Sequence, residues 1–359
     1  MKLVVLGLSI TSAWGNGHAT TYRGLIREFA KLGHQVVFLE RDVPWYASQR
    51  DLRDFACAEV ILYQSVDDLR ENHAQTVRSA DAVIVGSYVP DGIEIGNWVL
   101  KIATGITAFY DIDTPVTLAQ LERGGLTYLA REQIARYDLY LSFAGGRTLE
   151  VLHNRYGSPR AVPLYCSVDP EHYFPSPLDP LWLLGYLGTY SADRQPALER
   201  LMLEPARHLP QEQFVVTGPQ YPQELLWAHN VERIEHLAPD QHCEFYNRQR
   251  FTLNVTRADM VAAGHSPSVR LFEAAACATP IISDAWDGLD ELFILGEEIL
   301  VAADPSEALE ILTTISPTRA AQIGTAGRAR ILANHTAAHR ALELEHHLVG
   351  VVVGEVSLI

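Results

Sequence analysis

The segment from Thr252 to Asp284 holds the densest set of residues able to bind an anionic ligand. An apolar run ends near Arg257, and a helix-forming stretch follows Ser266 and Pro267, residue types that favour a helix N-cap and first turn. A helix N-terminus presents free backbone N–H groups and a positive dipole end, which suits a phosphate. We therefore expect a diphosphate site here, and the residues expected around it are Asn254, Arg257, Ser266, Ser268, Val269 and Arg270.

Glu273 lies on the same predicted helix among Phe272 and three alanines. A lone carboxylate in an apolar setting is costly unless something pairs with it. Two adjacent ribose hydroxyls would satisfy it through both oxygens. The alternative is a surface glutamate that faces solvent or pairs with Arg270, three residues earlier.

The segment from Leu184 to Arg194 (LGYLGTYSADR) forms a second candidate site. An apolar strand ends there in Gly188, Thr189 and Tyr190, and Arg194 follows within one turn. Small residues at the carboxyl end of a strand allow a ligand to approach the backbone closely. Arg194 would then be a second clamp on the phosphates, unless the segment is only a turn with a solvated arginine.

A third candidate is the loop Gly15, Asn16 and Gly17, which precedes a predicted helix. With Glu40 at the end of the next strand, it suggests the GxGxxG fingerprint of dinucleotide binding. The match fails because Thr20 takes the last glycine position and because Gly15 does not directly follow the strand. A long loop of this kind suits the shaping of a ligand pocket better than NAD binding.

His18 and Asp113 are candidates for contact with a reacting group. His18 lies near a helix N-terminus, although a lone histidine is often a structural hydrogen-bonding residue. Asp111 and Asp113 follow an apolar strand in YDIDTP, and Asp113 could act as a general base or contact an acceptor hydroxyl. An Asx-turn before Pro115 is the alternative. A metal site is not expected at this DxD, nor at His335 and His339.

Short apolar runs alternate with helical patterns through the whole chain, which predicts an α/β protein with parallel sheets in two Rossmann-like halves. Five prolines between Pro163 and Pro180 indicate an interdomain linker. The expected domains are 1–168 and 181–335, and the segment 336–359 is expected to pack back on the first. One helical stretch is predicted from about Pro317 to Leu348, and a strand or arm after it.

Composition excludes several functions. The 359 residues carry 44 acidic side chains against 28 Lys plus Arg, for a net charge of −16, and no basic block suits nucleic acid. The only lysines are Lys2, Lys31 and Lys101, so a P-loop lysine is absent and a Schiff-base enzyme is disfavoured. Scattered cysteines and the lack of a long apolar run indicate a reduced, cytoplasmic protein with no transmembrane segment.

The chain resembles two-Rossmann-domain GT-B glycosyltransferases, and more narrowly the CgeB-like family named after a spore maturation protein. The segments that carry the resemblance are YDIDTPVTL, YLGTYSADRQ, GPQYP, HTAAHRA and, most specifically, SPSVRLFEAAACATP. The resemblance implies a nucleotide-sugar donor in the C-terminal domain, with Glu273 on the ribose and Arg194, Arg257 and the helix start at Ser266 around the diphosphate. It also implies an acceptor site in the N-terminal domain and a reaction cleft between the two domains.

Two positions depart from the family pattern. Retaining relatives often carry two glutamates separated by seven residues, and His265 stands here in place of the first while Glu273 matches the second. Ala278 stands where relatives favour glycine. His265 joins His18 and Asp113 as a candidate catalytic residue.

The expected activity is that of a glycosyltransferase (EC 2.4 type) that uses a nucleoside diphosphate sugar, with UDP-sugar and retention favoured, and that requires no metal or other cofactor. The acceptor and the oligomeric state are not predicted. A nucleotide-sugar 2-epimerase has the same architecture and is one alternative. A non-catalytic nucleotide-sugar binding protein is the other, suggested by His265.

Overall fold

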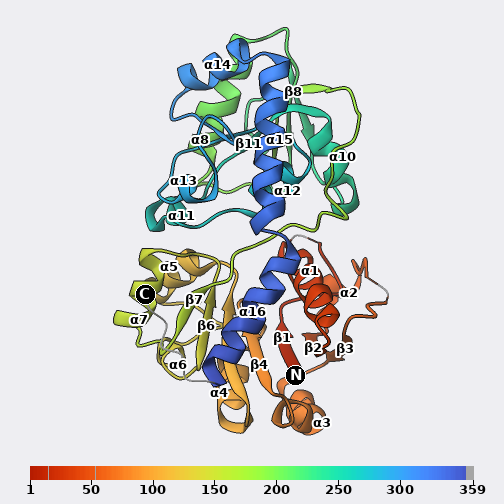
Figure 1. Ribbon diagram of the computed structural model, residues 1–359, viewed down its shortest axis with the longest axis vertical. Coiled ribbons are helices and arrows are strands. Elements are labelled where there is room, and N and C mark those ends of the chain that lie inside the picture. Colours follow the sequence, from red (N-terminus) through yellow and green to blue (C-terminus); the bar gives the residue numbers. More distant parts are fainter. Residues whose placement is uncertain (15, 53, 353–359) are drawn as a thin grey trace. The chain divides into compact units, whose positions relative to one another are not determined.

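The computed structural model describes residues 1–14, 16–52 and 54–352. The chain divides into two compact units: unit 1 comprises Met1–Cys166 together with the chain from Ala337 onward, and unit 2 comprises Ser167–Thr336. Each unit is built around one sheet with helices packed on it (Figure 1). The predicted α/β class with two parallel sheets is confirmed.

Unit 1 contains a seven-stranded sheet in the order β3-β2-β1-β4-β5-β6-β7, and every neighbouring pair is parallel. This is a doubly wound order, in which the chain leaves β1 toward opposite edges of the sheet. The strands are β1 (Lys2–Gly7), β2 (Gln35–Arg41), β3 (Glu59–Tyr63), β4 (Ala82–Gly86), β5 (Ile106–Asp111), β6 (Leu139–Ser142) and β7 (Ala161–Pro163). Strand β3 is an edge strand and is only partly buried.

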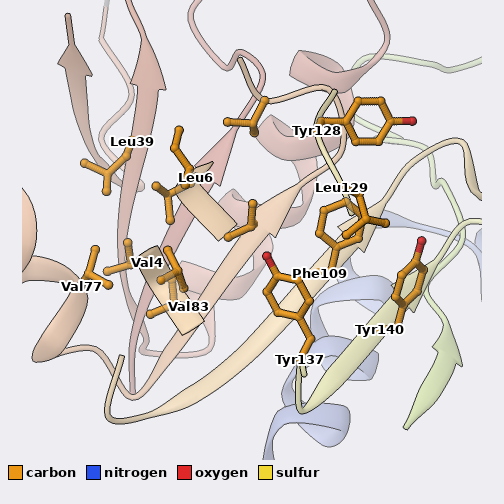
Figure 2. Packing of buried hydrophobic residues seen from close by; sticks show 14 of the residues in the cluster. Val4, Leu6, Leu39, Val77, Val83, Phe109, Tyr128, Leu129, Tyr137 and Tyr140 are labelled. Atoms are coloured by element: carbon orange, nitrogen blue, oxygen red, sulfur yellow. The ribbon is translucent and has the colours of Figure 1, made fainter. Parts of the chain in front are cut away.

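The core of unit 1 lies between this sheet and its helices. Figure 2 shows Val4 of β1 beside Val77 of the helix α3, with Leu39 and Phe109 elsewhere in the same cluster, and all four are buried. The helices are α1 (His18–Lys31), α2 (Pro44–Ala47), α3 (Val66–Arg78), α4 (Gly92–Ile102), α5 (Thr114–Arg123), α6 (Arg131–Ile134), α7 (Arg147–Asn154) and α16 (Ala337–Val352).

Helix α16 packs beside α1, although more than 300 residues separate them in the sequence (Figure 1). A Cβ added to Gly24 would lie 3.2 Å from the Cβ of Ala337, so the helices approach closely at this glycine. His34 Nε2 lies 2.8 Å from Glu345 Oε1 at the other end of the contact. The last residues of the chain, 353–359, lie outside the described residues, as does the part of the expected arm or strand that falls on them.

Unit 2 contains a six-stranded parallel sheet in the order β10-β9-β8-β11-β12-β13. Its strands are β8 (Trp182–Leu187), β9 (Phe214–Thr217), β10 (Val231–Ile234), β11 (Gln249–Asn254), β12 (Ile281–Ser283) and β13 (Leu300–Val301). The helices are α8 (Gln195–Leu198), α9 (Glu204–His208), α10 (His242–Asn247), α11 (Ala258–Ala263), α12 (Val269–Ala276), α13 (Leu289–Leu292), α14 (Pro305–Thr314) and α15 (Pro317–Asn334). A π-helical turn (Glu199–Leu203) joins α8 to α9, and a 3₁₀ turn (Pro239–Gln241) precedes α10.

The helical stretch predicted from about Pro317 to Leu348 consists of two helices. Helix α15 ends at Asn334, and α16 begins at Ala337. The chain leaves the helix at His335, whose carbonyl accepts from Val168 N–H at 3.2 Å, and Thr336 pairs with Val168 as an isolated bridge. The break thus occurs where the chain passes from unit 2 back to unit 1.

Candidate functional site

The candidate site of unit 2 lies at the carboxyl ends of β8 and β11. These strands are neighbours, and the chain winds outward from them in opposite directions, which is where open α/β sheets bind ligands. Gly188 to Arg194 follow β8, and Arg257 follows β11. Helix α12 contributes residues to the same edge, because its side chains bond to the ends of both strands.

Arg270 is the centre of this arrangement. Its Nε donates to the Leu187 carbonyl at 2.6 Å and its Nη1 to Asn254 Oδ1 at 3.0 Å, while its guanidinium lies 4.8 Å from the Tyr186 ring centroid. The side chain is buried, and both hydrogen-bond partners are neutral. The positive charge is therefore held at the end of β8 without a hydrogen-bonded carboxylate.

The start of α12 differs from the sequence prediction. Ser268, and not Ser266, is the N-cap residue, and its hydroxyl donates to Asn254 Oδ1 at 2.7 Å instead of capping the helix. Ser266 is buried two residues earlier, and Val269 is the first helical residue. The first-turn N–H groups therefore have no side-chain cap, because the polar side chain that could supply one is bonded to the end of β11.

Two glycines allow the strand ends to pack closely. A Cβ on Gly188 would lie 2.9 Å from Arg270 Nη2 and 2.6 Å from Tyr186 Oη. Gly218 has φ +140°, and a Cβ there would lie 2.2 Å from the Gly188 carbonyl oxygen. The loops after β8 and β9 therefore touch backbone to backbone beside the arginine.

Arg194 and Arg257 reach the same edge from the loops. Arg194 Nη2 donates to the Thr189 carbonyl at 2.8 Å, and its Nε is buried with no hydrogen-bond partner among the described residues. Arg257 Nε lies 3.8 Å from Asp193 Oδ2, and that carboxylate also accepts from Ala258 N–H at 3.1 Å. A buried guanidinium N–H without a partner is expensive, which indicates a position prepared for an acceptor.

Glu273 is buried and hydrogen-bonded by two tyrosines. Tyr173 Oη donates to Oε1 at 2.9 Å and Tyr246 Oη to Oε2 at 3.0 Å. Arg270, the partner considered from the sequence, bonds elsewhere. Each carboxylate oxygen retains acceptor capacity, since an ionised carboxylate has about four acceptor positions.

A pocket of about 420 Å³ lies beside the loop after β9. Arg233 lies 4.2 Å from the Tyr221 ring centroid and 4.7 Å from that of Trp227, and its Nη2 donates to the Gly218 carbonyl at 2.9 Å. Tyr221 Oη donates to the Gly188 carbonyl at 3.2 Å, which joins the pocket to the strand ends. Burial raises the pKa of Tyr221, and the positive charges of Arg233, Arg194 and Arg270 oppose this shift.

His265 lies between α11 and α12 in the left-handed region, with φ 46°. Its Nε2 lies 3.0 Å from Glu291 Oε1, and its N–H donates to the Asp287 carbonyl at 2.6 Å. A Cβ on Gly288 would lie 2.5 Å from the imidazole ring. The ring is therefore fixed between a carboxylate and a glycine that leaves room for it.

In unit 1, Glu40 serves the loop that follows β1. Its Oε2 accepts from the N–H groups of Ile10 at 2.6 Å and Thr11 at 3.0 Å, and its Oε1 accepts from the hydroxyls of Ser9 and Thr11 at 3.1 and 2.6 Å. A carboxylate with four donors cannot serve as the free ribose acceptor of a dinucleotide fold.

The loop before α1 is held by its own polar atoms. Asn16 Oδ1 accepts from Ala19 N–H at 3.2 Å, and its amide donates to the carbonyls of Ser12 and Trp14. Gly17 is the helix N-cap, with φ −86°. Gly15 lies outside the described residues.

His18 and Asp113 lie on either side of Tyr88. The His18 ring meets the Tyr88 ring edge to face with centroids 5.4 Å apart, and Tyr88 Oη donates to Asp113 Oδ2 at 3.1 Å. Burial lowers the pKa of His18 to about 4, and its Nδ1 has no hydrogen-bond partner among the described residues. The ring is therefore neutral at pH 7.

Asp111, which the sequence places beside Asp113, is fully buried and accepts from Tyr140 Oη at 2.6 Å and Thr117 Oγ1 at 2.9 Å. Burial raises the pKa of its carboxyl group to about 6.

Within 1–14, 16–52 and 54–352, no group of three or more His, Cys, Asp and Glu residues is arranged to hold a metal ion. In the same part of the chain, no helix combines the length and apolar character needed to cross a membrane.

Comparison with known proteins relates the chain to glycosyltransferases. A family model described as glycosyl transferase-like matches residues 194–346. Sucrose-phosphate synthase from Thermosynechococcus elongatus is similar in structure (14% identity, TM-score 0.69, covering 99% of this chain and 100% of that chain). Anabaena HepE in complex with UDP-glucose is also similar in structure (14% identity, TM-score 0.69, covering 98% of this chain and 100% of that chain). A glycosyltransferase from Rickettsia africae is a third similar structure (12% identity, TM-score 0.66, covering 98% of this chain and 99% of that chain). No curated protein sequence matches.

The chain has the GT-B fold. The narrower CgeB-like resemblance stays a prediction from the sequence.

In this GT-B chain, sequence reasoning missed several residues at the site: Tyr173, Asp193, Tyr221, Trp227, Arg233 and Tyr246. Tyr173 lies in the proline-rich segment predicted as a linker, and the residues of that segment from Ser167 onward belong to unit 2. The segments GPQYP and VERIEHL contain Tyr221 and Arg233, but no local spacing places Arg233 beside the rings of both Tyr221 and Trp227. Only the parallel pairing of β9 with β10 does so.

Proposed function

We propose that this protein transfers a glycosyl group from a UDP-sugar to an acceptor, with the diphosphate held by arginines and backbone N–H groups and without a required metal. The observation that carries the proposal is Arg194 and Arg270 at the ends of β8 and β11, where their hydrogen-bond partners among the described residues are all neutral. The glycosyl transferase-like match over 194–346 and the UDP-glucose in HepE support it.

The donor roles follow from what each side chain offers. Arg194, Arg257 and Arg270 would contact the diphosphate, together with the uncapped start of α12 and the hydroxyl of Ser268. Glu273 would accept from the ribose hydroxyls while Tyr173 and Tyr246 fix its orientation. We assign the base to the pocket near Tyr221, because that residue joins the pocket to Gly188.

Transfer breaks the bond between the anomeric carbon and the β-phosphate oxygen and forms a bond from that carbon to an acceptor oxygen. The charge that develops on the leaving UDP is the quantity to stabilise, and fixed donors in a site with little water do this well. We propose retention of configuration, with His265 near the sugar. His18, which is neutral at pH 7, and Asp113 are the residues that we propose to contact the acceptor hydroxyl and to take its proton.

Calorimetric titration with UDP, GDP and dTDP tests the donor site. We expect UDP to bind most tightly, in the micromolar range (about −8 kcal/mol), and to bind equally well after EDTA treatment. If none of the three binds more tightly than millimolar, the proposal fails. Glu273→Gln tests the ribose contact, because it keeps the shape of the side chain and removes its charge; unchanged UDP affinity would remove Glu273 from the site.

A non-catalytic nucleotide-sugar binding protein is the second candidate. It is favoured by His265, which replaces the first glutamate of retaining relatives and is bonded to Glu291. Incubation with UDP-N-acetylglucosamine alone distinguishes the classes. Slow release of free sugar with retained configuration, followed by NMR, supports a transferase. A 2-epimer as product indicates an epimerase, and an intact donor after prolonged incubation favours the binding protein.

A further inference from the structure

Two thiols of unit 2 lie side by side next to the Glu273 cluster. Cys243 Sγ on α10 and Cys277 Sγ at the end of α12 are 3.9 Å apart. Cys243 is partly exposed and Cys277 is buried, so solvent reaches only one of the pair. The other cysteines, Cys57 and Cys166, belong to unit 1.

The surroundings make the two thiols chemically unequal. The Cys277 thiol donates to Cys243, and this contact lowers the pKa of Cys243 to about 6 against the effect of its partial burial. The same contact raises the pKa of Cys277, and burial adds to that shift. A partly exposed thiolate beside a buried thiol is the arrangement of an attacking cysteine with a resolving partner.

Both thiols belong to the elements that position Glu273. Tyr246, three residues after Cys243 on α10, donates to Glu273 Oε2 at 3.0 Å, and Glu273 lies four residues before Cys277 on α12. Thr279 Oγ1 donates to the Tyr246 carbonyl at 2.8 Å and ties the end of α12 to α10. A change in the separation of the two sulfurs therefore acts on the helices that hold the carboxylate.

We propose that Cys243 and Cys277 are a peroxide-reactive pair whose disulfide weakens nucleotide binding at Glu273. The second half of this inference rests on the proposed function. A disulfide requires a sulfur separation of about 2.05 Å, so the thiols must approach and draw α10 toward α12. This closure shifts α10, and with it the Tyr246 hydroxyl that orients Glu273, so the carboxylate no longer faces the ribose hydroxyls.

The chemistry balances with hydrogen peroxide as the oxidant. The Cys243 thiolate attacks one peroxide oxygen, the O–O bond breaks, and Cys243 becomes a sulfenic acid while the departing hydroxide takes a proton to form water. The Cys277 sulfur then attacks Cys243 Sγ, the S–O bond breaks, and the Cys277 proton leaves with the hydroxyl as a second water. Two thiols lose two electrons and two protons, and one peroxide becomes two waters.

The test treats the intact protein with a few equivalents of hydrogen peroxide and maps its peptides under non-reducing conditions. We expect a Cys243–Cys277 disulfide, an affinity for UDP reduced by about tenfold, and recovery of both with dithiothreitol. Cys57→Ser is the matched control, since Cys57 is also partly exposed, and it should respond like the unchanged protein. Cys243→Ser should give neither a disulfide nor a change in affinity.

Cys277→Ser tests the order of events without depending on disulfide formation. With no resolving thiol, the sulfenic acid at Cys243 should persist and be trapped by dimedone. Over-oxidation of the two thiols without a linked peptide would overturn the inference, and a disulfide with unchanged UDP affinity would overturn its link to Glu273. If the reduced protein does not bind UDP, the proposed function fails, while the peptide map still decides the thiol pair.

Discussion

The carboxyl ends of the two sheets use buried charge in opposite ways. In unit 1 the charged groups are carboxylates, and Glu40 accepts from four donors of the loop beside it. In unit 2 the buried Asp284 is likewise paired, with donors of Thr256, but Arg270 is buried as well and donates to a carbonyl and an amide oxygen, both neutral. A fully paired charge stabilises the fold, whereas a charge with neutral partners retains its field for a ligand. Two similar folds thus differ in what their strand ends can bind.

Glu40→Ala gives the largest expected effect on this comparison. Four donors in a buried loop lose their acceptor, so the free energy of unfolding should fall by about 3 to 5 kcal/mol, measured by urea denaturation. UDP affinity should not change, because the loop belongs to unit 1. The matched control is Glu94→Ala, which removes an exposed ion pair with Arg70 and should cost less than about 1 kcal/mol. A loss of UDP affinity in Glu40→Ala would contradict a purely structural role.

His18 and Asp111 should give unit 1 two opposing pH dependences. The folded-state pKa of His18 is lowered to about 4, so stability from its neutral form is lost as pH falls from 6.5 toward 4. The folded-state pKa of Asp111 is raised to about 6, so the cost of its buried charge is relieved as pH falls from 6 toward 3.8. Each of these two effects changes the free energy of unfolding by about 3 kcal/mol, and because they have opposite signs they nearly cancel.

Single variants separate the two contributions. Relative to the unchanged protein, His18→Gln should become more stable as pH falls from 6.5 to 4. Asp111→Asn should start more stable at pH 7 and lose that advantage over the same range. Urea denaturation at several pH values measures both, and parallel curves for the two variants would show that burial does not shift these groups.

The sequence could identify Glu40 and Glu273 as candidate ribose acceptors but could not predict which groups their carboxylates bond. Both glutamates stand at positions that family patterns connect with a ribose. Glu40 is occupied by donors from Ser9 to Thr11, which the chain brings close only through the parallel pairing of β1 with β2. Glu273 meets Tyr173 from 100 residues earlier in the sequence. Local spacing locates a carboxylate, whereas its partners depend on the order of the strands.

Arg194→Ala tests the strand ends of unit 2, where the proposed donor site lies. Removal of a guanidinium with a buried, unpartnered Nε should lower UDP affinity by about 10- to 100-fold, or about 1.4 to 2.7 kcal/mol, with little loss of stability. Calorimetry measures the affinity. Arg207→Ala is the matched control, because Arg207 lies in the same unit and pairs on the surface with Glu199 at 2.6 Å. Equal affinities for the two variants would assign Arg194 to the fold.

Ala278→Gly gives the smallest expected effect. Ala278 has φ 57°, where a side chain costs about 1 kcal/mol relative to glycine, so this substitution should stabilise unit 2 by that amount and leave UDP affinity unchanged. Ala321→Gly on the exposed side of α15 should cost about 1 kcal/mol instead. Thermal denaturation compares the signs. Destabilisation by both substitutions would show that Ala278 is not strained.

The same residue shows what a family pattern can supply. The preference for glycine at position 278 anticipates a left-handed conformation, which the structure has there. The two-residue error at the start of α12 has a different origin. Ser266 and Ser268 are equally good caps by residue type, and the bond from Ser268 to Asn254 of β11 selects the later one. Strands, helices and the arginine-rich ends were predictable, but the choice between equivalent polar residues was not.

Val168 near the start of unit 2 pairs with Thr336 at its end, so the two ends of this unit lie side by side. Unit 2 is therefore an insertion within the chain of unit 1, with its two ends together. During synthesis, the sheet of unit 1 emerges first but lacks α16 until all of unit 2 has been made. Unit 2 can thus fold while the helix that covers α1 is still being translated, and unit 1 gains this helix only after unit 2 has been made.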